Sequence, residues 1–128
     1  MAGHTEDLWF NDKADFTKWV TAKGFLHEPF AVVDVGVQGD VNGRWNLLGD
    51  HLIVHGFDAI EEVIDKLKRW NRLRPNRHFH NLAIGNVDEE QIFYFNAANP
   101  SSSSMYEQGE SRFEGLLSKE ARSVTMRR

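Results

Sequence analysis

The segment Phe30-Ala-Val-Val-Asp-Val-Gly-Val-Gln-Gly39 decides the fold, because it joins a short apolar run directly to a glycine-bearing turn. Residues 30–35 are apolar except for Asp34, which is typical of a strand buried on both faces of a parallel sheet. Residues 52–57 repeat this character, and only a short helical segment, at 43–50, fits between the two runs. The sequence therefore predicts two buried, parallel strands.

The clearest helical periodicity in the chain lies at residues 59–74, where apolar residues recur at steps of three and four. Asp58 is the expected N-cap of this helix, and Pro75 ends it. Its apolar stripe comprises Ile60, Val63, Ile64, Leu67, Trp70 and Leu73. We expect this stripe to pack against the predicted sheet.

Weaker patterns flank this region. An N-terminal helix is predicted at 11–24, and two further strands are predicted at 78–84 and 91–95 as a hairpin-like pair. Residues 112–119 predict a helical turn, and residues 123–126 a last short strand. The apolar stripe of the N-terminal helix comprises Phe16, Trp19 and Val20.

Strands that alternate with helices define the α/β class, with a mostly parallel sheet and flanking helices. A complete doubly wound sheet of this kind has six or seven strands from two halves. The 128 residues predict about the first half of such a sheet. We expect an N-terminal helical cover at 1–29 and an incomplete sheet domain at 30–128.

Composition narrows the function classes. The chain has a net charge of −4 and a sequence pI of about 5.8, which argues against a nucleic-acid partner. It lacks cysteine, and no apolar run approaches the ~18 residues of a membrane span. The N-terminus has no apolar core typical of a secretory signal. We therefore expect a cytoplasmic protein with no membrane partner.

The six histidines do not predict a metal site. His51 and His55 are four residues apart, but they fall in or beside a predicted strand and have no third ligand nearby. His78 and His80 share one face of another predicted strand. We expect no bound metal.

The pattern Asp34-x-Gly36-x-x-Gly39 predicts a ligand site at the carboxyl end of the first strand. Glycines allow the tight turn and a close approach of the backbone to a ligand. Asp58 follows Gly39 by 19 residues, which matches the acidic residue that binds ribose hydroxyls in nucleotide-binding βαβ units.

Charge distinguishes between candidate nucleotides. The dinucleotide fingerprint has three glycines, and only Gly36 and Gly39 are present. Asp34 and Asp40 flank the turn, so a pyrophosphate there would be repelled. S-adenosylmethionine carries an ammonium, a sulfonium and a ribose diol, and it suits an acidic turn better. It is the cofactor that we expect.

Three ordered segments strengthen this expectation. Phe30 to Gly39 resembles the first motif of the FkbM-type methyltransferases, which are class I, S-adenosylmethionine-dependent enzymes, and His55-Gly-Phe-Asp-Ala-Ile-Glu-Glu62 is similar to their second-strand acidic motif. Leu82-Ala-Ile-Gly-Asn86 resembles a third, and an aromatic strand and a serine-rich loop follow it. Asp58 departs from the more common glutamate, and Ala59 from the usual proline.

The resemblance implies a Rossmann-like methyl-donor-binding domain that corresponds to the N-terminal portion of these transferases. It implies donor contacts at Asp34, Gly36 and Gly39, ribose contact by Asp58, and adenine near the turn from Ala83 to Asn86. The methyl acceptor would be a small molecule or glycan, such as a sugar hydroxyl. No catalytic residue is assigned.

Two other classes remain open. The chain could be a non-catalytic, truncated nucleotide-binding or interaction module, because an incomplete sheet leaves an unpaired strand edge through which a homodimer can form. A fragment of a nicotinamide-dependent oxidoreductase is the third class, and the charge argument disfavours it.

Overall fold

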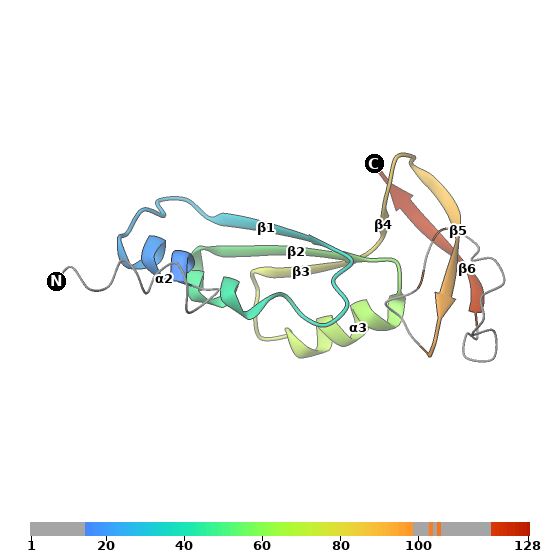
Figure 1. Cartoon of the computed structure of the whole chain (residues 1–128), viewed down its shortest axis with the longest axis horizontal. Helices are drawn as coiled ribbons and strands as arrows, with labels where there is room; N and C mark the ends of the chain where they lie inside the picture. Colours follow the sequence, from blue (N-terminus) through green and yellow to red (C-terminus); the bar gives the residue numbers. More distant parts are fainter. Residues whose placement is uncertain (1–14, 99–102, 104, 106–118) are drawn as a thin grey trace.

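The computed structural model describes residues 15–98, 103, 105 and 119–128, which form two small sheets and three helices. The elements are α2 (Asp15–Ala22), β1 (Phe30–Val35), the 3₁₀ helix η2 (Gly43–His51), β2 (Leu52–Asp58), α3 (Glu61–Trp70), β3 (Arg77–Asn81), β4 (Ala83–Ile84), β5 (Glu89–Asn96) and β6 (Lys119–Arg127). One sheet is all parallel, in the order β1-β2-β3, and the other is mixed, in the order β4-β6-β5 (Figure 1). The predicted α/β class and the parallel neighbours β1 and β2 are confirmed.

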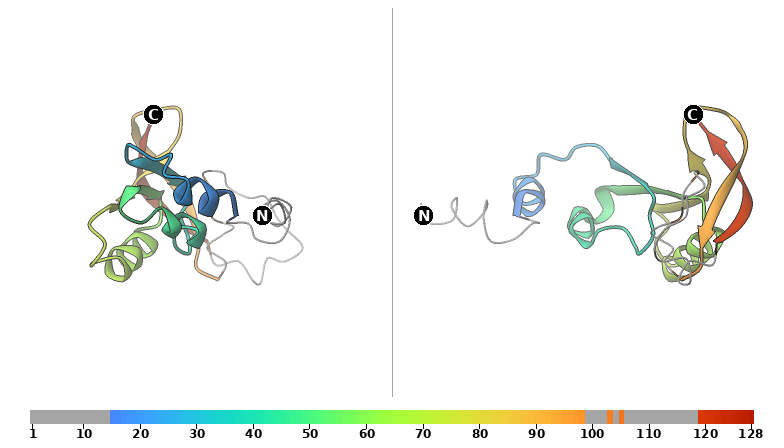
Figure 2. Two further views of the ribbon diagram at one scale, coloured as in Figure 1. Left: turned by 90° about the vertical axis from the view of Figure 1, so that its left-hand side faces the viewer. Right: turned by 45° about the vertical axis from the view of Figure 1, so that its right-hand side comes forward.

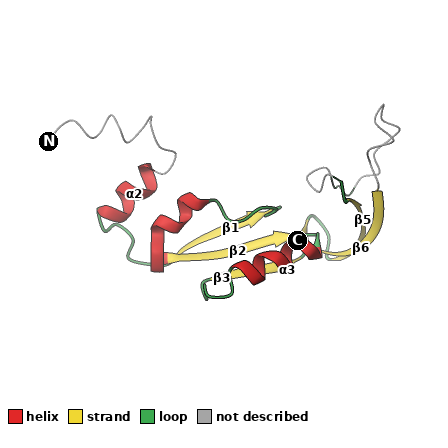
Figure 3. Cartoon of the chain, turned by 90° about the horizontal axis from the view of Figure 1, so that it is seen from below, coloured by secondary structure: helices red, strands yellow, loops and turns green. Residues whose placement is uncertain are grey.

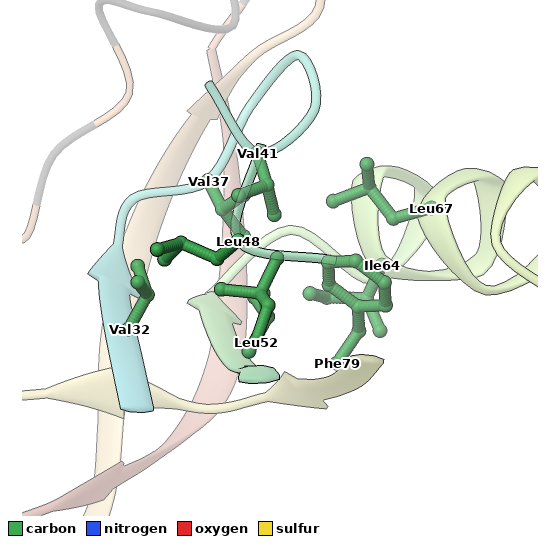
Figure 4. Close-up of a cluster of buried hydrophobic side chains, with 9 residues drawn as sticks. Val32, Val37, Val41, Leu48, Leu52, Ile64, Leu67 and Phe79 are labelled. Atoms are coloured by element: carbon green, nitrogen blue, oxygen red, sulfur yellow. The ribbon is translucent and has the colours of Figure 1, made fainter. Parts of the chain in front are cut away.

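The parallel sheet has a helical layer on one face (Figure 3). Helices η2 and α3 connect its successive strands, and their buried side chains join those of the strands in one apolar cluster (Figure 4). The cluster comprises Val32, Val37, Val41, Leu48, Leu52, Val54, Ile64, Leu67 and Phe79. Both connecting helices therefore cover the same face.

Helix α3 uses only part of its predicted apolar stripe. Ile64 and Leu67 are 1% and 0% exposed, whereas Trp70 and Leu73 are 59% and 84% exposed. The helix ends at Trp70, so Leu73 follows in a turn and leaves the sheet-facing side. The prediction that these last two residues belong to the stripe is wrong.

The prediction that the first strand is buried on both faces is also wrong. Only Val32 of β1 is buried, whereas Val33 and Val35 are 64% and 57% exposed. Side chains alternate along a strand, so Val33 and Val35 lie on the face opposite to η2 and α3. None of the described helices covers that face, and β1 lies at the edge of the sheet.

The predicted strand at 78–84 is divided between the two sheets. The amide of Leu82 donates to the carbonyl of His80 at 3.0 Å, and this tight turn separates β3 from β4. The predicted hairpin-like pair is wrong, because β4 and β5 do not pair with each other. Strand β6 lies between them, parallel to β4 and antiparallel to β5. Figure 2 shows these three strands grouped at the end of the molecule away from α2.

The predicted last strand at 123–126 is confirmed and is longer, because β6 begins at Lys119. Of the predicted helical turn at 112–119, residues 112–118 lie outside the described residues. Instead of one half of a single sheet, the described chain thus forms a parallel sheet followed by a mixed one.

Helix α2 is the described part of the predicted helix at 11–24, and it packs on η2. Thr17 is its buried side chain, whereas Phe16 is 64% exposed, so the predicted stripe is partly wrong. None of the described helices is long and apolar enough to span a lipid bilayer.

Candidate functional site

A cavity of about 440 Å³ lies where the parallel strands end and the second sheet begins. This is the edge at which doubly wound sheets bind their ligands. The ends of β1 and β2 contribute Val35, Gly36, Gln38, Phe57, Asp58, Ala59 and Ile60, and the later segments contribute Leu82, Ala83, Ile84, Phe93, Ser103, Met105 and Met126. The cavity is therefore shared by both sheets.

Gly36 forms the turn that leads out of β1 into this cavity. Its φ is +81°, a conformation that side chains with a Cβ rarely adopt. The amides of Gly36 and Val37 both donate to the carbonyl of Phe57, at 2.8 and 3.2 Å. These bonds attach the turn to the end of β2. The glycine is required by the backbone conformation, since no atom lies within 4 Å of a Cβ placed there.

Asp58 is the charged residue of the lining, at the carboxyl end of β2. Its Oδ1 accepts a hydrogen bond from the amide of Ile60 at 2.8 Å, and the residue is 6% exposed. Burial raises the pKa of the carboxyl group, and the hydrogen bond from Ile60 opposes this effect. In the described chain Oδ2 receives no hydrogen bond, so it remains available to a ligand hydroxyl.

The prediction that Asp58 is the N-cap of the following helix is wrong in detail. Ile60 occupies the N-cap position of α3 without a side-chain bond, and Asp58 instead stabilises the turn that precedes it. The side-chain nitrogen of Asn81 also donates to the backbone carbonyl of Asp58, at 3.1 Å. These contacts hold the end of β2 in place from both sides.

Asp34 lies two residues before Gly36, opposite Gly56 in the pairing of β1 with β2. It is half-buried and does not line the cavity, because alternation places its side chain on the same face as the core residue Val32. Gly39 does not line the cavity either, although it belongs to the same connection. Of the three predicted donor contacts of the first motif, the cavity brings only Gly36 to its wall.

The Asp40 carboxylate contacts other residues of the chain instead of the cavity. Its Oδ1 accepts from the amide of Val41 at 2.7 Å and lies 3.4 Å from the Asn71 side-chain nitrogen and 3.7 Å from Arg77 Nη1. Asp40 thus ties the connection after β1 to the end of α3 and the start of β3. It does not line the cavity, so the expected repulsion of a pyrophosphate by Asp40 loses its geometric basis.

The predicted adenine turn is only partly at the site. Ala83 lines the cavity from β4, whereas Asn86 is exposed and outside the lining. Between them, a Cβ on Gly85 would overlap the thioether of Met126, so the glycine allows β4 to approach β6 closely. Met126 in turn lines the cavity.

Apart from Ala83, the sequence predicted no site role for the wall formed by β5, β6, Ser103 and Met105. Phe93 of β5, Met126 of β6, and Ser103 and Met105 face the cavity beside Leu82. The Ser103 hydroxyl accepts from the amide of Asn96 at 3.0 Å, which fixes it near the end of β5. The aromatic strand and the serine-rich loop were visible in the sequence, but the pairing of β5 with β6 was not predicted.

The lining is apolar apart from a few polar groups. Among the described residues it contains the Asp58 carboxylate and neither lysine nor arginine. Such a lining favours an uncharged or cationic ligand with hydroxyl groups over a phosphate-bearing one. The described residues contain no group of three or more histidines, cysteines or carboxylates arranged to hold a metal ion.

Comparison of the chain with protein-family models, with curated proteins and with solved structures gave no match. The resemblance to the FkbM-type methyltransferases therefore rests on the three motifs alone.

Proposed function

We propose that this chain binds S-adenosylmethionine in the cavity between its two sheets, as the donor-binding half of a methyltransferase. The acceptor is a small molecule or a glycan hydroxyl. In this proposal Asp58 binds the ribose hydroxyls, the Gly36 turn carries the amino-acid end of the donor, and Ala83 borders the adenine.

The buried carboxylate of Asp58 carries the proposal. A carboxylate at the end of the second strand, beside a glycine turn from the first, is the arrangement that binds a ribose diol in nucleotide-binding sheets. Oδ1 is occupied by the Ile60 amide, and Oδ2 remains for the ligand. A cavity of about 440 Å³ is large enough for a nucleoside-sized ligand.

The chemistry is a displacement that depends on proximity. When bound, the sulfonium supplies a methyl group to the acceptor oxygen, its sulfur leaves as a neutral thioether, and the hydroxyl proton is lost to a base. The residues of this chain bind and orient the methyl donor. Asp58 fixes the sugar, while Phe57, Phe93 and Met126 provide apolar surface that excludes water. No described residue is assigned as the base.

Isothermal titration calorimetry of the full chain tests the proposal, with S-adenosylmethionine and NAD as ligands. We expect binding of the first and not of the second. Asp58→Asn keeps an acceptor for the Ile60 amide but removes the charge, and loss of charge-assisted hydrogen bonds should weaken binding about 10- to 100-fold. Asp65→Asn, an exposed carboxylate on α3, is the matched control. Tight NAD binding, or unchanged affinity in Asp58→Asn, contradicts the proposal.

A second candidate function is assembly through the outer edge of β1. This strand pairs only with β2, so its other edge presents free backbone groups in the described chain. We propose that two copies pair antiparallel about Val33. Opposed residues must lie on the same face, and this register places Val33 against its copy and Val35 against Ala31. Asp34, the only charge on β1, then faces Val32 instead of a second carboxylate.

Light scattering across a range of concentrations tests this second candidate. We expect a dimer in the original chain and a monomer in Val33→Lys, because a lysine at the centre would oppose its own copy. Ile92→Lys, at a half-exposed apolar site on β5, is the control and should still form dimers. A monomeric original chain rejects this candidate without affecting the proposal for the cavity.

A further inference from the structure

The end of α3 and the turn that follows it carry an unusual concentration of positive charge. Residues 66–77 contain six lysines and arginines and no carboxylate. The other 116 residues hold nine cations against nineteen carboxylates. The molecule is therefore strongly asymmetric in charge, and it would be oriented by any anionic surface that it approaches.

Two large apolar side chains lie among these cations. Leu73 is 84% exposed and Trp70 is 59% exposed. Lys66 and Trp70 lie four residues apart on one flank of α3, and Leu73 follows in the turn after the helix. Lys66, Arg69, Trp70, Arg72, Leu73 and Arg74, all exposed, are here called the basic end.

The charges of the basic end are not neutralised within the described chain. Lys66 Nζ lies 4.2 Å from the centre of the Trp70 ring, and Arg74 donates to the Asn71 side chain at 3.2 Å. No described carboxylate forms an ion pair with any of the four cations. By contrast, Arg122 lies 2.7 Å from Glu62, so α3 uses a carboxylate near its beginning for a structural ion pair.

We propose that the basic end docks on an anionic lipid surface. The cations contact the headgroups, while Leu73 and the ring of Trp70 enter the interfacial layer, where a long apolar side chain and an amphipathic ring are both favoured. A nucleic acid would account for the cations, but it would leave Leu73 exposed to water. The combination of basic and apolar side chains therefore favours a lipid surface.

The topology gives this docking a direction. Helix α3 begins beside Asp58, at the carboxyl edge of the parallel sheet, and ends next to the start of β3. The basic end therefore lies at the amino edge, and the cavity at the opposite edge. A molecule docked by its basic end keeps the mouth of the cavity away from the lipid.

Vesicle flotation with the full chain tests the proposal. We expect binding to vesicles of phosphatidylcholine with phosphatidylserine, no binding to pure phosphatidylcholine, and weaker binding as salt is added. Arg69→Gln and Arg72→Gln should each weaken binding about fivefold. Leu73→Ser should weaken it roughly tenfold, because it removes the apolar side chain that enters the interfacial layer on docking.

The matched controls are exposed residues elsewhere. Lys23→Gln and Arg128→Gln remove cations, Ile92→Ser removes an apolar side chain, and all three should leave binding unchanged. Absence of binding, or equal binding to neutral vesicles, overturns the proposal. An RNA oligonucleotide that displaces the vesicles, with an affinity unaffected by Leu73→Ser, would also overturn it and assign the basic end to nucleic acid.

Discussion

The two sheets of this chain differ in how far apart along the sequence their partners lie. In the parallel sheet each strand pairs with the next strand along the chain, and the helix between them covers the joint. In the mixed sheet, β4 and β5 are held together by β6, which begins only at Lys119. The first sheet thus has a local core, whereas the second depends on one distant strand.

The largest expected effect tests whether the core belongs to the first sheet. Leu67 is 0% exposed beneath the parallel sheet, so Leu67→Ala should lower the free energy of unfolding by about 2–5 kcal/mol. Val124→Ala, in β6 and 8% exposed, removes about two buried methylene equivalents and should cost about 1.5 kcal/mol. Urea denaturation measures both.

Leu73→Ala, at an 84% exposed position, is the control for the leucine substitution and should change stability by less than about 0.5 kcal/mol. An equal loss at Val124 and Leu67 would contradict the difference between the sheets.

Two glycines distinguish rigid from adjustable packing. A Cβ on Gly56 would lie 2.8 Å from the Phe79 ring and 2.9 Å from Val37, both in the core. Gly56→Ala should therefore cost about 1–3 kcal/mol through overpacking. At Gly85 the obstacle is the flexible end of Met126, which can move.

Gly85→Ala should consequently cost less than Gly56→Ala in the same urea experiment. The double variant Gly56→Ala/Phe79→Leu provides the check, since space freed at the ring should recover part of the loss. If Gly85→Ala is the less stable of the two variants, the packing around Gly85 is the more rigid, contrary to this prediction.

Particular residues show how much of this fold could be predicted. Strands β1 and β2, helix α3 and the placing of Gly36 and Asp58 at one cavity followed from local apolar runs and spacing. The break at Leu82 did not, because a two-residue turn leaves no mark in the hydrophobic pattern.

Exposure was harder to predict than secondary structure. The apolar Val33, Trp70 and Leu73 look like core residues in a sequence window, and only their exposed fractions in the folded chain show that they are not. The same holds for Asp34 and Asp40, since alternation and the contacts of Arg77 decide which way their side chains point. The part of the cavity wall that β5 and β6 form depends on pairing between strands far apart in the sequence, which no local pattern predicts.

A pH effect should arise on the uncovered face of the parallel sheet. The His55 Nδ1 and His80 Nε2 atoms are 3.2 Å apart, and the His80 ring stacks on Phe57 with ring centres 4.7 Å apart. Burial, followed by the charges of His55, His78 and Lys68, lowers the pKa of His80 below its ordinary value of 6.5. The unfolded chain then binds this proton more readily than the folded one.

Stability should therefore be complete above about pH 6.5 and should decrease as the pH falls through that value. Urea midpoints measured from about pH 8 to about pH 5 would show this, and His80→Asn should flatten the profile. His27→Asn, an exposed histidine outside the cluster, should leave the profile unchanged. An unchanged profile in His80→Asn would assign the effect to other groups.

The smallest expected effect concerns the link between the two sheets. Arg122 of β6 lies 2.7 Å from Glu62 of α3 and 3.1 Å from Glu120, and it stacks over the Phe95 ring. The hydrogen bond from Arg122 lowers the pKa of Glu62, so the contribution of this pair is present above about pH 4.5 and is lost as the pH falls. Since Glu62 is 61% exposed, a double-mutant cycle with Glu62→Gln and Arg122→Gln should give a coupling of about 0.2–1 kcal/mol at neutral pH. A coupling larger than the Val124→Ala effect would mean that the second sheet is held mainly by this ion pair instead of by its own strand pairing.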